Sequence, residues 1–177
     1  QKDAPELSLT LECVHGYRAQ DARNNAIYNY KGEVVYSSAA LGIVYNKEHH
    51  RQRFFRQHEG DIVSLAMHPT GQYVATADRG PRPKVWIWDS TSGNAIASFG
   101  ELHQHSIPVV AFSPGDATGI GGGNRLVTVG RDENHTVAIY HTLTGNWDDG
   151  RLQAFAQSGK QDILFACFIA GGGEFEL

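Results

Sequence analysis

Three side chains in the sequence, His58, Thr76 and Trp88, are of types that could form a proton relay in a hydrolase. Such an enzyme also needs an activated nucleophile, commonly a serine on a Gly-x-Ser-x-Gly turn that exposes its hydroxyl. That turn is absent from the sequence. We therefore expect the three side chains to form a structural hydrogen-bonded network, and we expect no catalytic residue and no enzyme activity.

Histidines gather in two stretches of the sequence, at His49, His50 and His58 and again at His103 and His105. A zinc site holds its ligands in a closed geometry, usually with cysteine among them. Neither of the two cysteines lies near these histidines in the sequence. The pattern therefore predicts solvated loop histidines and no metal site.

The glycine-rich stretch 119–123 has the composition of a phosphate-binding loop. A phosphate cradle, however, needs a Lys-Ser or Lys-Thr pair after the glycines and the N-terminus of a helix behind them. The pair is missing, and we expect no helix there. This stretch predicts a flexible loop between strands, and no cofactor is expected.

The overall composition restricts the class of protein. The chain has 177 residues, with 15 basic and 19 acidic side chains, and this mild acidity argues against a nucleic-acid partner. The longest apolar run is only a few residues, too short to cross a bilayer, and the N-terminus lacks the apolar core of a secretory signal. Two cysteines, Cys13 and Cys167, suit a reducing compartment. The only methionine is not at position 1, so we expect an internal piece of something longer or a chain that lacks its start.

Short runs rich in Val, Ile, Tyr, Phe and Thr alternate with turn residues among the 20 glycines and 6 prolines. This pattern is typical of many short strands, and no stretch of helical length has helical apolar periodicity. We expect a nearly all-β fold. The predicted strands are 26–30, 33–38, 41–46 and 52–56, then 62–68, 73–77, 84–88 and 95–99, then 109–113, 125–129, 136–140 and 152–156, and finally 163–168 with 175–177.

The sets of strands repeat one another. The segment 65–69, which ends in Pro69, lies 45 positions before 110–114, which ends in Pro114, and 165–168 resembles a further copy. Four strands in each of several repeats of 40–50 residues indicate β-propeller blades. We therefore predict a partial propeller of four-stranded antiparallel blades. Its predicted domains are 1–57, an N-terminal segment with a first atypical blade, and 58–177, with two complete blades and one truncated blade.

One repeat resembles the WD repeat, because Trp88-Asp89 ends its third strand and Gln57-His58 precedes its first. In that family a His, a Ser or Thr, a Trp and an Asp form a hydrogen-bonded network within a blade. The resemblance implies that His58, Thr76, Asp78 and Trp88 form it here. In the next repeat Thr128 and Asp132 match, Tyr140-His141 replaces Trp-Asp, and the histidine is either His103 or His105.

The N-terminal segment 7–25, with Gly16-Tyr17-Arg18 followed by Asp21, Arg23 and Asn24, resembles the HELP motif of the echinoderm microtubule-associated protein-like family. Gly32-Glu33-Val34-Val35-Tyr36 also fits that family, and the resemblance runs through essentially the whole chain. Cys13 stands where the family usually has Trp, Ala19 replaces a common Gly and Ala22 a common Cys.

The resemblance implies two joined propellers in the family, with the HELP segment packed into the first, and association with tubulin and microtubules. From the residues themselves, the alternation of Leu7, Leu9 and Leu11 with polar residues predicts an edge strand over 7–12. The polar stretch 18–25 predicts a structured loop in which Asp21 pairs with an arginine.

Two basic stretches could contact an acidic partner such as the tubulin surface. Their candidate contact residues are Lys47 and Arg51 in one and Arg79, Arg82 and Lys84 in the other. We therefore predict a non-catalytic cytoskeletal module that binds tubulin or microtubules, in the cytoplasm or a cilium, with no nucleic-acid or membrane partner. The alternative is a structural scaffold for other proteins in a cytoskeletal or axonemal assembly.

Overall fold

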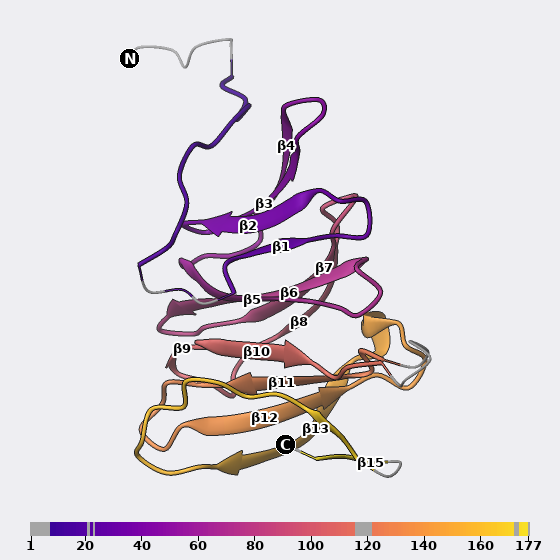
Figure 1. Cartoon of the computed structure of the whole chain (residues 1–177). Helices are drawn as coiled ribbons and strands as arrows, with labels where there is room; N and C mark the ends of the chain where they lie inside the picture. The colour runs from indigo at the N-terminus through magenta and orange to yellow at the C-terminus, as the bar shows by residue number, and fades with distance from the viewer. Residues whose placement is uncertain (1–7, 21, 23, 116–121, 172–173, 177) are drawn as a thin grey trace.

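Three antiparallel sheets of four strands each are stacked one on another in the computed structural model, which describes residues 8–20, 22, 24–115, 122–171 and 174–176 (Figure 1). The first blade comprises β1 (Ala26–Tyr28), β2 (Val34–Ser38), β3 (Leu41–Asn46) and β4 (Arg51–Phe55). The second comprises β5 (Ile62–Met67), β6 (Tyr73–Gly80), β7 (Val85–Asp89) and β8 (Ala95–Phe99). The third comprises β10 (Val109–Phe112), β11 (Arg125–Val129), β12 (Thr136–His141) and β13 (Arg151–Gln157).

Smaller elements complete the chain. The short strand β9 (His105–Ser106) pairs with the end of β6, and β14 (Ile169–Gly171) pairs with β15 (Glu174–Glu176). The one helical element among the described residues is the 3-10 turn η1 (Trp147–Asp149). The part of the chain described here contains no helix with the length and apolarity needed to cross a membrane.

Alternating side chains of the strands form a hydrophobic layer between each pair of blades. Val35, Val44 and Phe55 of the first blade meet Leu65 and Trp88 of the second. On the other side of the second blade, Ala75, Val85 and Ile87 pack in the same cluster as Phe112, Leu126 and Trp147 of the third. The first strands of the blades, β1, β5 and β10, contact one another in sequence, as the inner strands of a propeller do.

The expected all-β fold of stacked four-stranded blades is confirmed, and the strands of the first three sets match the predicted ranges closely. The predicted edge strand over 7–12 is wrong for residues 8–12, which form no strand, and Leu9 is fully exposed; residue 7 lies outside the described residues. The predicted strand over 163–168 is also absent. Residues 8–12 have the alternation of a strand but join no described sheet. Residues 163–168 are a continuous apolar run that lies beside residues of β5 and β10 around one pocket without being a strand.

The connections between strands lie at two opposite ends of the stack. The Lys47 rim contains the connections 29–33, 47–50, 68–72 and 90–94, which are linked by bonds such as Tyr30 N to Gly71 O, 3.2 Å. The Arg79 rim contains 39–40, 56–61, 79–84, 100–108, 130–135 and 158–162, linked for example by Ile62 N to Ala39 O, 2.9 Å. In Figure 1 the β3–β4 hairpin tip stands at the top, the other connections of the Lys47 rim lie to the right of the stack, and the Arg79 rim lies to the left. The two predicted basic stretches are therefore on opposite rims.

Candidate functional site

The structure brings His58, Thr76, Asp78 and Trp88 together inside the second blade, and none of the four is more than 7% exposed. His58 Nδ1 lies 2.8 Å from Asp78 Oδ2, and His58 Nε2 lies 2.7 Å from Thr76 Oγ1. Trp88 Nε1 donates to the same Thr76 oxygen at 3.0 Å. The carboxylate can only accept, so His58 Nδ1 donates to it; in a neutral imidazole Nε2 then accepts from the Thr76 hydroxyl, whose oxygen accepts from the indole. Every polar atom of the chain of bonds is thereby satisfied.

This network cannot work as a relay in this structure, because the Thr76 hydroxyl is fully buried and no substrate reaches it. Its carboxylate also fixes the backbone, since Asp78 Oδ1 accepts from Lys84 N at 2.7 Å. The network thus ties the strands β6 and β7 to the connections that contain His58 and Lys84.

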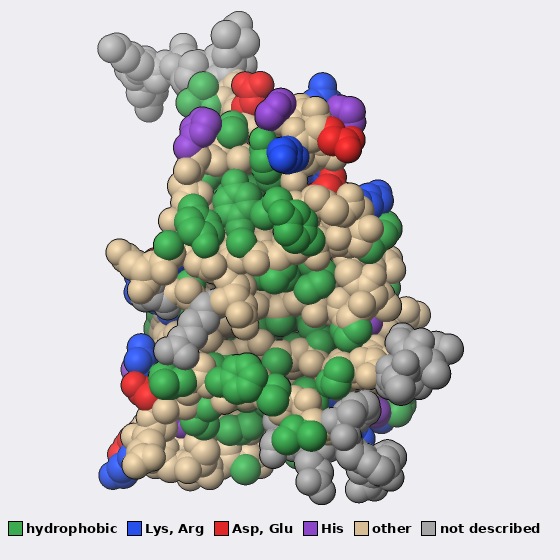
Figure 2. Space-filling model, viewed as in Figure 1, with side chains coloured by type: hydrophobic (Ala, Val, Ile, Leu, Met, Phe, Trp, Pro, Cys, Tyr) green, Lys and Arg blue, Asp and Glu red, His purple; other side chains and the backbone are tan. Residues whose placement is uncertain are grey.

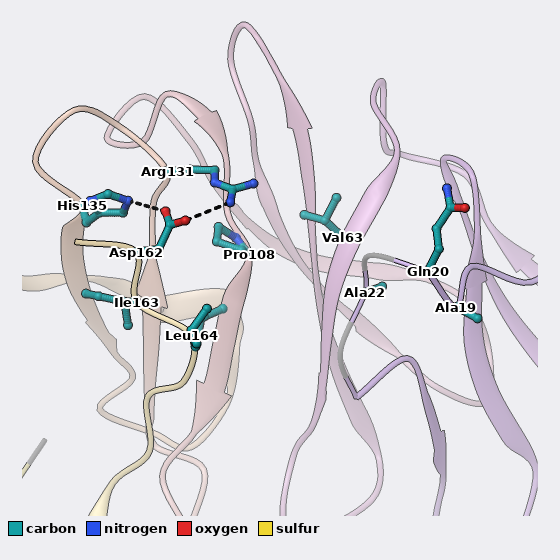
Figure 3. A pocket seen from close by; sticks show the side chains of 11 residues that line it. Ala19, Gln20, Ala22, Val63, Pro108, Arg131, His135, Asp162, Ile163 and Leu164 are labelled. Atoms are coloured by element: carbon teal, nitrogen blue, oxygen red, sulfur yellow. Dashed lines mark hydrogen bonds and ion pairs between the residues drawn. The ribbon is translucent and has the colours of Figure 1, made fainter. Parts of the chain in front are cut away.

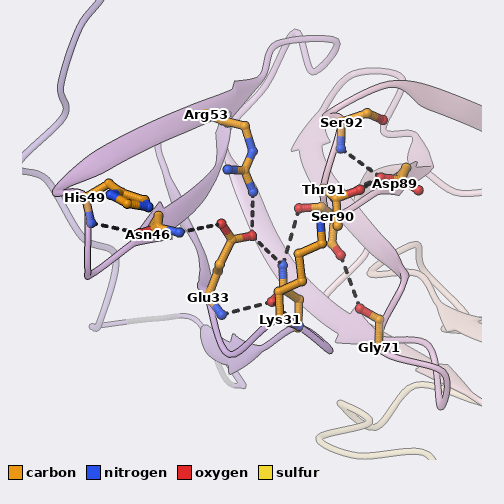
Figure 4. Close-up of polar contacts among 11 residues, drawn as sticks. Lys31, Glu33, Asn46, His49, Arg53, Gly71, Asp89, Ser90, Thr91 and Ser92 are labelled. Carbon is orange, nitrogen blue, oxygen red and sulfur yellow. Dashed lines mark hydrogen bonds and ion pairs between the residues drawn. The ribbon is translucent and has the colours of Figure 1, made fainter.

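Asp89, the acidic partner in the Trp-Asp pair, caps the turn that follows β7. Its Oδ1 accepts from Thr91 N at 2.8 Å, Thr91 Oγ1 at 2.7 Å and Ser92 N at 2.8 Å (Figure 4). Burial alone raises the pKa of Asp89, but the hydrogen bonds from Ser92, Thr91 and Gln72 outweigh it and hold the pKa at about 2.

In the third blade the equivalent network is incomplete. Of the two histidines that the sequence left open, His103 enters it, with Nε2 at 2.7 Å from Thr128 Oγ1, whereas His105 is exposed. His103 Nδ1 lies 3.6 Å from Asp132 Oδ2, and both atoms are buried without a hydrogen-bond partner. Burial lowers the pKa of His103, and the nearby Asp132 carboxylate opposes this effect. Tyr140 takes the place of the tryptophan and stacks on Phe99 at a ring distance of 4.3 Å.

The HELP segment runs along the first blade as an irregular strap. The Gln52 side-chain amide makes the two backbone hydrogen bonds that a paired strand would make, because it accepts from Val14 N at 2.7 Å and donates to Val14 O at 2.9 Å. A Cβ at Gly16 would stand only 2.5 Å from Ser38 Oγ, so the segment passes close to the end of β2 here. Tyr17 donates to Asn25 Oδ1 at 2.8 Å and meets the Tyr36 ring edge to face. Asp21 and Arg23 lie outside the described residues, and Asn24 is exposed with a φ of 49°.

Arg18 links the HELP segment to the second blade through an ion pair. Its Nη1 lies 3.1 Å from Asp61 Oδ2, and the same oxygen receives Arg79 Nη2 at 2.8 Å. Asp61 precedes β5, so one carboxylate joins the HELP segment to both the beginning of β5 and the end of β6. Sequence reasoning did not identify Asp61, because the pairing joins positions more than 40 residues apart.

A second polar cluster that sequence reasoning missed joins the first two blades at the Lys47 rim (Figure 4). Glu33, only 5% exposed, receives hydrogen bonds from Arg53 at 2.5 Å, Asn29 at 2.9 Å and Asn46 at 3.0 Å. The Arg53 bond is the main cause that lowers the pKa of Glu33 to about 2, against the opposing effect of burial. Asn29 Nδ2 also approaches Ser90 O of the second blade, at 3.5 Å. Asn29 lies in the turn 29–33, and its position two residues before Lys31-Gly32 is the only sequence signal for that turn.

The candidate contact residues differ in their pairing. Arg79 is paired with Asp61, and Lys84 Nζ lies 3.6 Å from Glu59 Oε1. Within the described part of the chain, Lys47, Arg51 and Arg82 are exposed and have no ion-pair partner.

A pocket of about 450 Å³ opens on the Arg79 rim (Figure 3). Val63, Pro108 and Leu164 give it an apolar wall. On its polar side Asp162 lies 3.2 Å from Arg131 Nη2 and 3.0 Å from His135 Nε2, and Arg131 first and His135 second lower its pKa. The lining residues include no serine, threonine or cysteine that could act as a nucleophile.

No group of three or more His, Cys, Asp or Glu side chains among the described residues could hold a metal ion. Of the glycine-rich stretch, residues 119–121 lie outside the described residues. Gly123 has a φ of 82°, and its N donates to Ser113 O at 2.9 Å, so it closes the turn between β10 and β11 rather than facing a ligand.

Comparison with known proteins places this geometry in context. Residues 4–43 match the family model of the HELP motif. Rat echinoderm microtubule-associated protein-like 2 is 34% identical over 177 residues, which cover 95% of this chain and 26% of the relative. Mouse echinoderm microtubule-associated protein-like 1 is 33% identical over 94% of this chain and 20% of the relative. The ciliary WD repeat-containing protein ctxp80 of Euplotoides octocarinatus is 35% identical over 52% of this chain and 15% of its own length. The chain thus spans about a quarter or less of these relatives.

Proposed function

Because the chain belongs, over 95% of its length, to the echinoderm microtubule-associated protein-like family, we propose that it is a non-catalytic module that associates with tubulin or microtubules through propeller blades. The observation that carries this proposal is the HELP motif in its structural setting. The motif is held to the first blade by Gln52 and to the second by Asp61, so it acts as part of the blade framework. A rigid framework of this kind presents loops on two rims, which suits a large protein partner.

The proposal includes the division of the chain at residue 57, between the HELP segment with the first blade and the later blades. It also includes a location on cytoplasmic microtubules or in a cilium, with no catalytic role. The division agrees with the separate sheets β1–β4 and β5–β8, and the names of the relatives, which are microtubule-associated and ciliary proteins, support the location.

Co-sedimentation tests the proposal directly. The purified chain is mixed with polymerised tubulin, and the bound fraction is measured in the pellet over a range of polymer concentrations. We expect saturable binding that weakens with added salt, because the candidate contacts are surface charges. A bound fraction no higher than that of an unrelated protein of similar charge would refute the proposal.

A scaffold for other proteins of a ciliary or cytoskeletal assembly is the second candidate, favoured by the similarity to the ciliary WD repeat-containing protein. Affinity purification from a ciliated cell extract, with and without polymerised tubulin, separates the two. Partners recovered equally well without tubulin support the scaffold, whereas partners recovered only with tubulin support the first proposal.

A further inference from the structure

His135, in the connection before β12, faces an acceptor with each of its two ring nitrogens. Its Nδ1 lies 3.1 Å from the Gly159 carbonyl oxygen, and its Nε2 lies 3.0 Å from Asp162 Oδ1. We name these two bonds the His135 clasp. A carbonyl and a carboxylate oxygen can only accept, so the ring makes both bonds only when both nitrogens carry a proton. His58 differs, because one of its nitrogens faces the Thr76 hydroxyl, which can donate to a neutral ring.

Asp162 remains a carboxylate over the pH range in which histidine titrates. Its Oδ2 lies 3.2 Å from Arg131 Nη2, and Arg131 first and His135 second hold the pKa of Asp162 below its ordinary value of 3.8. The proton between the ring and the carboxylate is therefore carried by His135, which is only 9% exposed. The imidazolium is the one form of this ring that completes the clasp.

Few other charged groups lie near the ring. Among the described residues of the two connections that the clasp joins, they are Asp162 with Arg131, Asp132, and the exposed Glu133 and Lys160. Asp132 Oδ1 already accepts from Thr136 N and Thr136 Oγ1, at 2.7 and 3.0 Å. The pocket beside the clasp adds no further titratable side chain from the described residues that line it. Asp162 is therefore the counterion of a protonated His135.

The clasp reinforces a backbone contact between the connections 130–135 and 158–162. Two amides of the later connection each donate to Asn134 O at 3.1 Å. The clasp extends this contact to Asp162, the point at which the chain leaves the rim. It thus helps to determine how firmly the following segment is held.

The segment that follows Asp162 crosses the third blade beside β10, and residues 163–168 of it form no strand (Figure 1). Leu164 and Phe165 are 61% and 68% exposed, and hydrophobic side chains are visible on this face of the molecule in Figure 2. Residues 162–164 also form one side of the pocket on the Arg79 rim, with Val63 on the other side (Figure 3). The position of this segment therefore determines how far the pocket and β10 are covered.

We propose that the His135 clasp is a proton-dependent switch, which is closed when both ring nitrogens carry a proton and opens when one proton is lost. A neutral ring turns a lone pair toward either the Gly159 oxygen or the Asp162 carboxylate, so one hydrogen bond becomes a contact between two acceptors. Histidine is the side chain that ordinarily changes charge near neutral pH. The clasp therefore opens as the pH rises, and residues 160–164 then uncover the pocket beside them. This inference is independent of the partner proposed above.

Trypsin can report the opening, because Lys160 lies inside the segment and a protease must bind its substrate as an extended chain. The rate of cleavage after Lys160 in the whole chain is measured by mass spectrometry at about pH 6 and about pH 8. Each rate is divided by that of a free peptide of residues 156–166 with the same sequence, which removes the pH dependence of trypsin itself. This cleavage ratio follows the population of the open form when reclosing is faster than cleavage.

Two variants remove the proton dependence in different ways. His135→Asn suits the φ of 46° at this position, since asparagine readily adopts the left-handed conformation, but its side chain is too short to make both bonds. Asp162→Asn supplies an amide that can donate to a neutral ring, so the second proton is no longer needed. His50→Asn is the matched control, because His50 has a φ of 49° and its Nδ1 faces the Tyr45 hydroxyl, which can donate.

We expect the cleavage ratio of wild type and of His50→Asn to rise about fivefold from the lower to the higher pH, as one charge-assisted hydrogen bond is lost. In His135→Asn and Asp162→Asn it should change less than about twofold. Circular dichroism verifies that the variants fold, and Asp162→Asn suffices for the test if His135→Asn does not. A wild-type ratio that stays constant, or a rise of equal size in either clasp variant, would overturn the proposal.

Discussion

The second and third blades contain the same buried His–Thr–Asp arrangement, but only the second completes it. In the second blade, His58 lies within 2.8 Å of both Asp78 and Thr76, and the Trp88 indole satisfies the remaining acceptor. In the third blade, the distance from His103 to Asp132 is 3.6 Å, and Tyr140 has no N–H with which to reach Thr128. The comparison shows that a repeat can keep its strands and its register after its internal network has weakened.

Packing between blades explains how the third blade is held without the full network. Tyr140 is only 4% exposed and stacks on Phe99 of the second blade, while Trp147 lies fully buried beside Phe112. Aromatic burial of this kind contributes several kcal/mol, which is more than the roughly 1 kcal/mol of an ordinary hydrogen bond. The second blade has the equivalent stack of Trp88 on Phe55, so this packing is common to both blades and the polar network is what differs between them.

The largest contrast is expected from removal of the threonine hydroxyl in each blade. Thr76→Val leaves both His58 Nε2 and Trp88 Nε1 buried without a partner, and we expect it to lower the free energy of unfolding by about 3 kcal/mol. Thr128→Val leaves only His103 Nε2 buried without a partner, and we expect it to lower the free energy of unfolding by about 1 kcal/mol. Urea unfolding measures both. Equal losses in the two variants would mean that the blades do not differ in the way described.

A smaller contrast is expected at the aromatic position. Trp88→Phe removes the indole donor and part of a side chain that stacks on Phe55 at 4.9 Å, so we expect a loss of about 2 kcal/mol. Tyr140→Phe keeps the ring, and its hydroxyl makes no hydrogen bond to a described residue, so the change should stay within about 0.5 kcal/mol. Thermal unfolding of the two variants, each against wild type, provides the measurement. A larger cost for the tyrosine variant would contradict the comparison.

The smallest effect is a pH dependence that belongs to the third blade. The pKa of folded His103 lies below its ordinary value of 6.5, so the unfolded chain takes up the proton first. The stability that neutral His103 contributes is therefore present above pH 6.5 and is lost as the pH falls through the folded pKa. The slope cannot exceed about 1.4 kcal/mol per pH unit, the limit for one proton.

His103→Gln tests this dependence because glutamine does not titrate. Unfolding free energies of wild type and variant are measured between pH 7.5 and pH 5.5. We expect the advantage of wild type over the variant to shrink as the pH falls. Parallel curves would show that His103 does not titrate differently in the folded and unfolded chain.

The sequence was sufficient to predict the strands because short β-rich runs separated by glycine and proline are local signals. It could not show that residues 8–12 and 163–168 stay outside the sheets, since that depends on how they lie against the blades in space. The quartet around His58 could be proposed because a repeat pattern places its members, whereas the choice of His103 over His105 required the fold. The pairings of Asp61 with Arg18 and of Glu33 with Arg53 join distant positions, and no spacing rule marks them.

The order of the blades has a consequence for how the molecule opens. The second blade is the only described sheet that is covered on both faces, whereas every residue of β13 in the third blade is exposed. Local opening begins where few apolar contacts hold a strand. In heavy water the amides of β13 should therefore exchange first and those of β6 and β7 last, so that the central sheet keeps its protons after its neighbours have lost theirs.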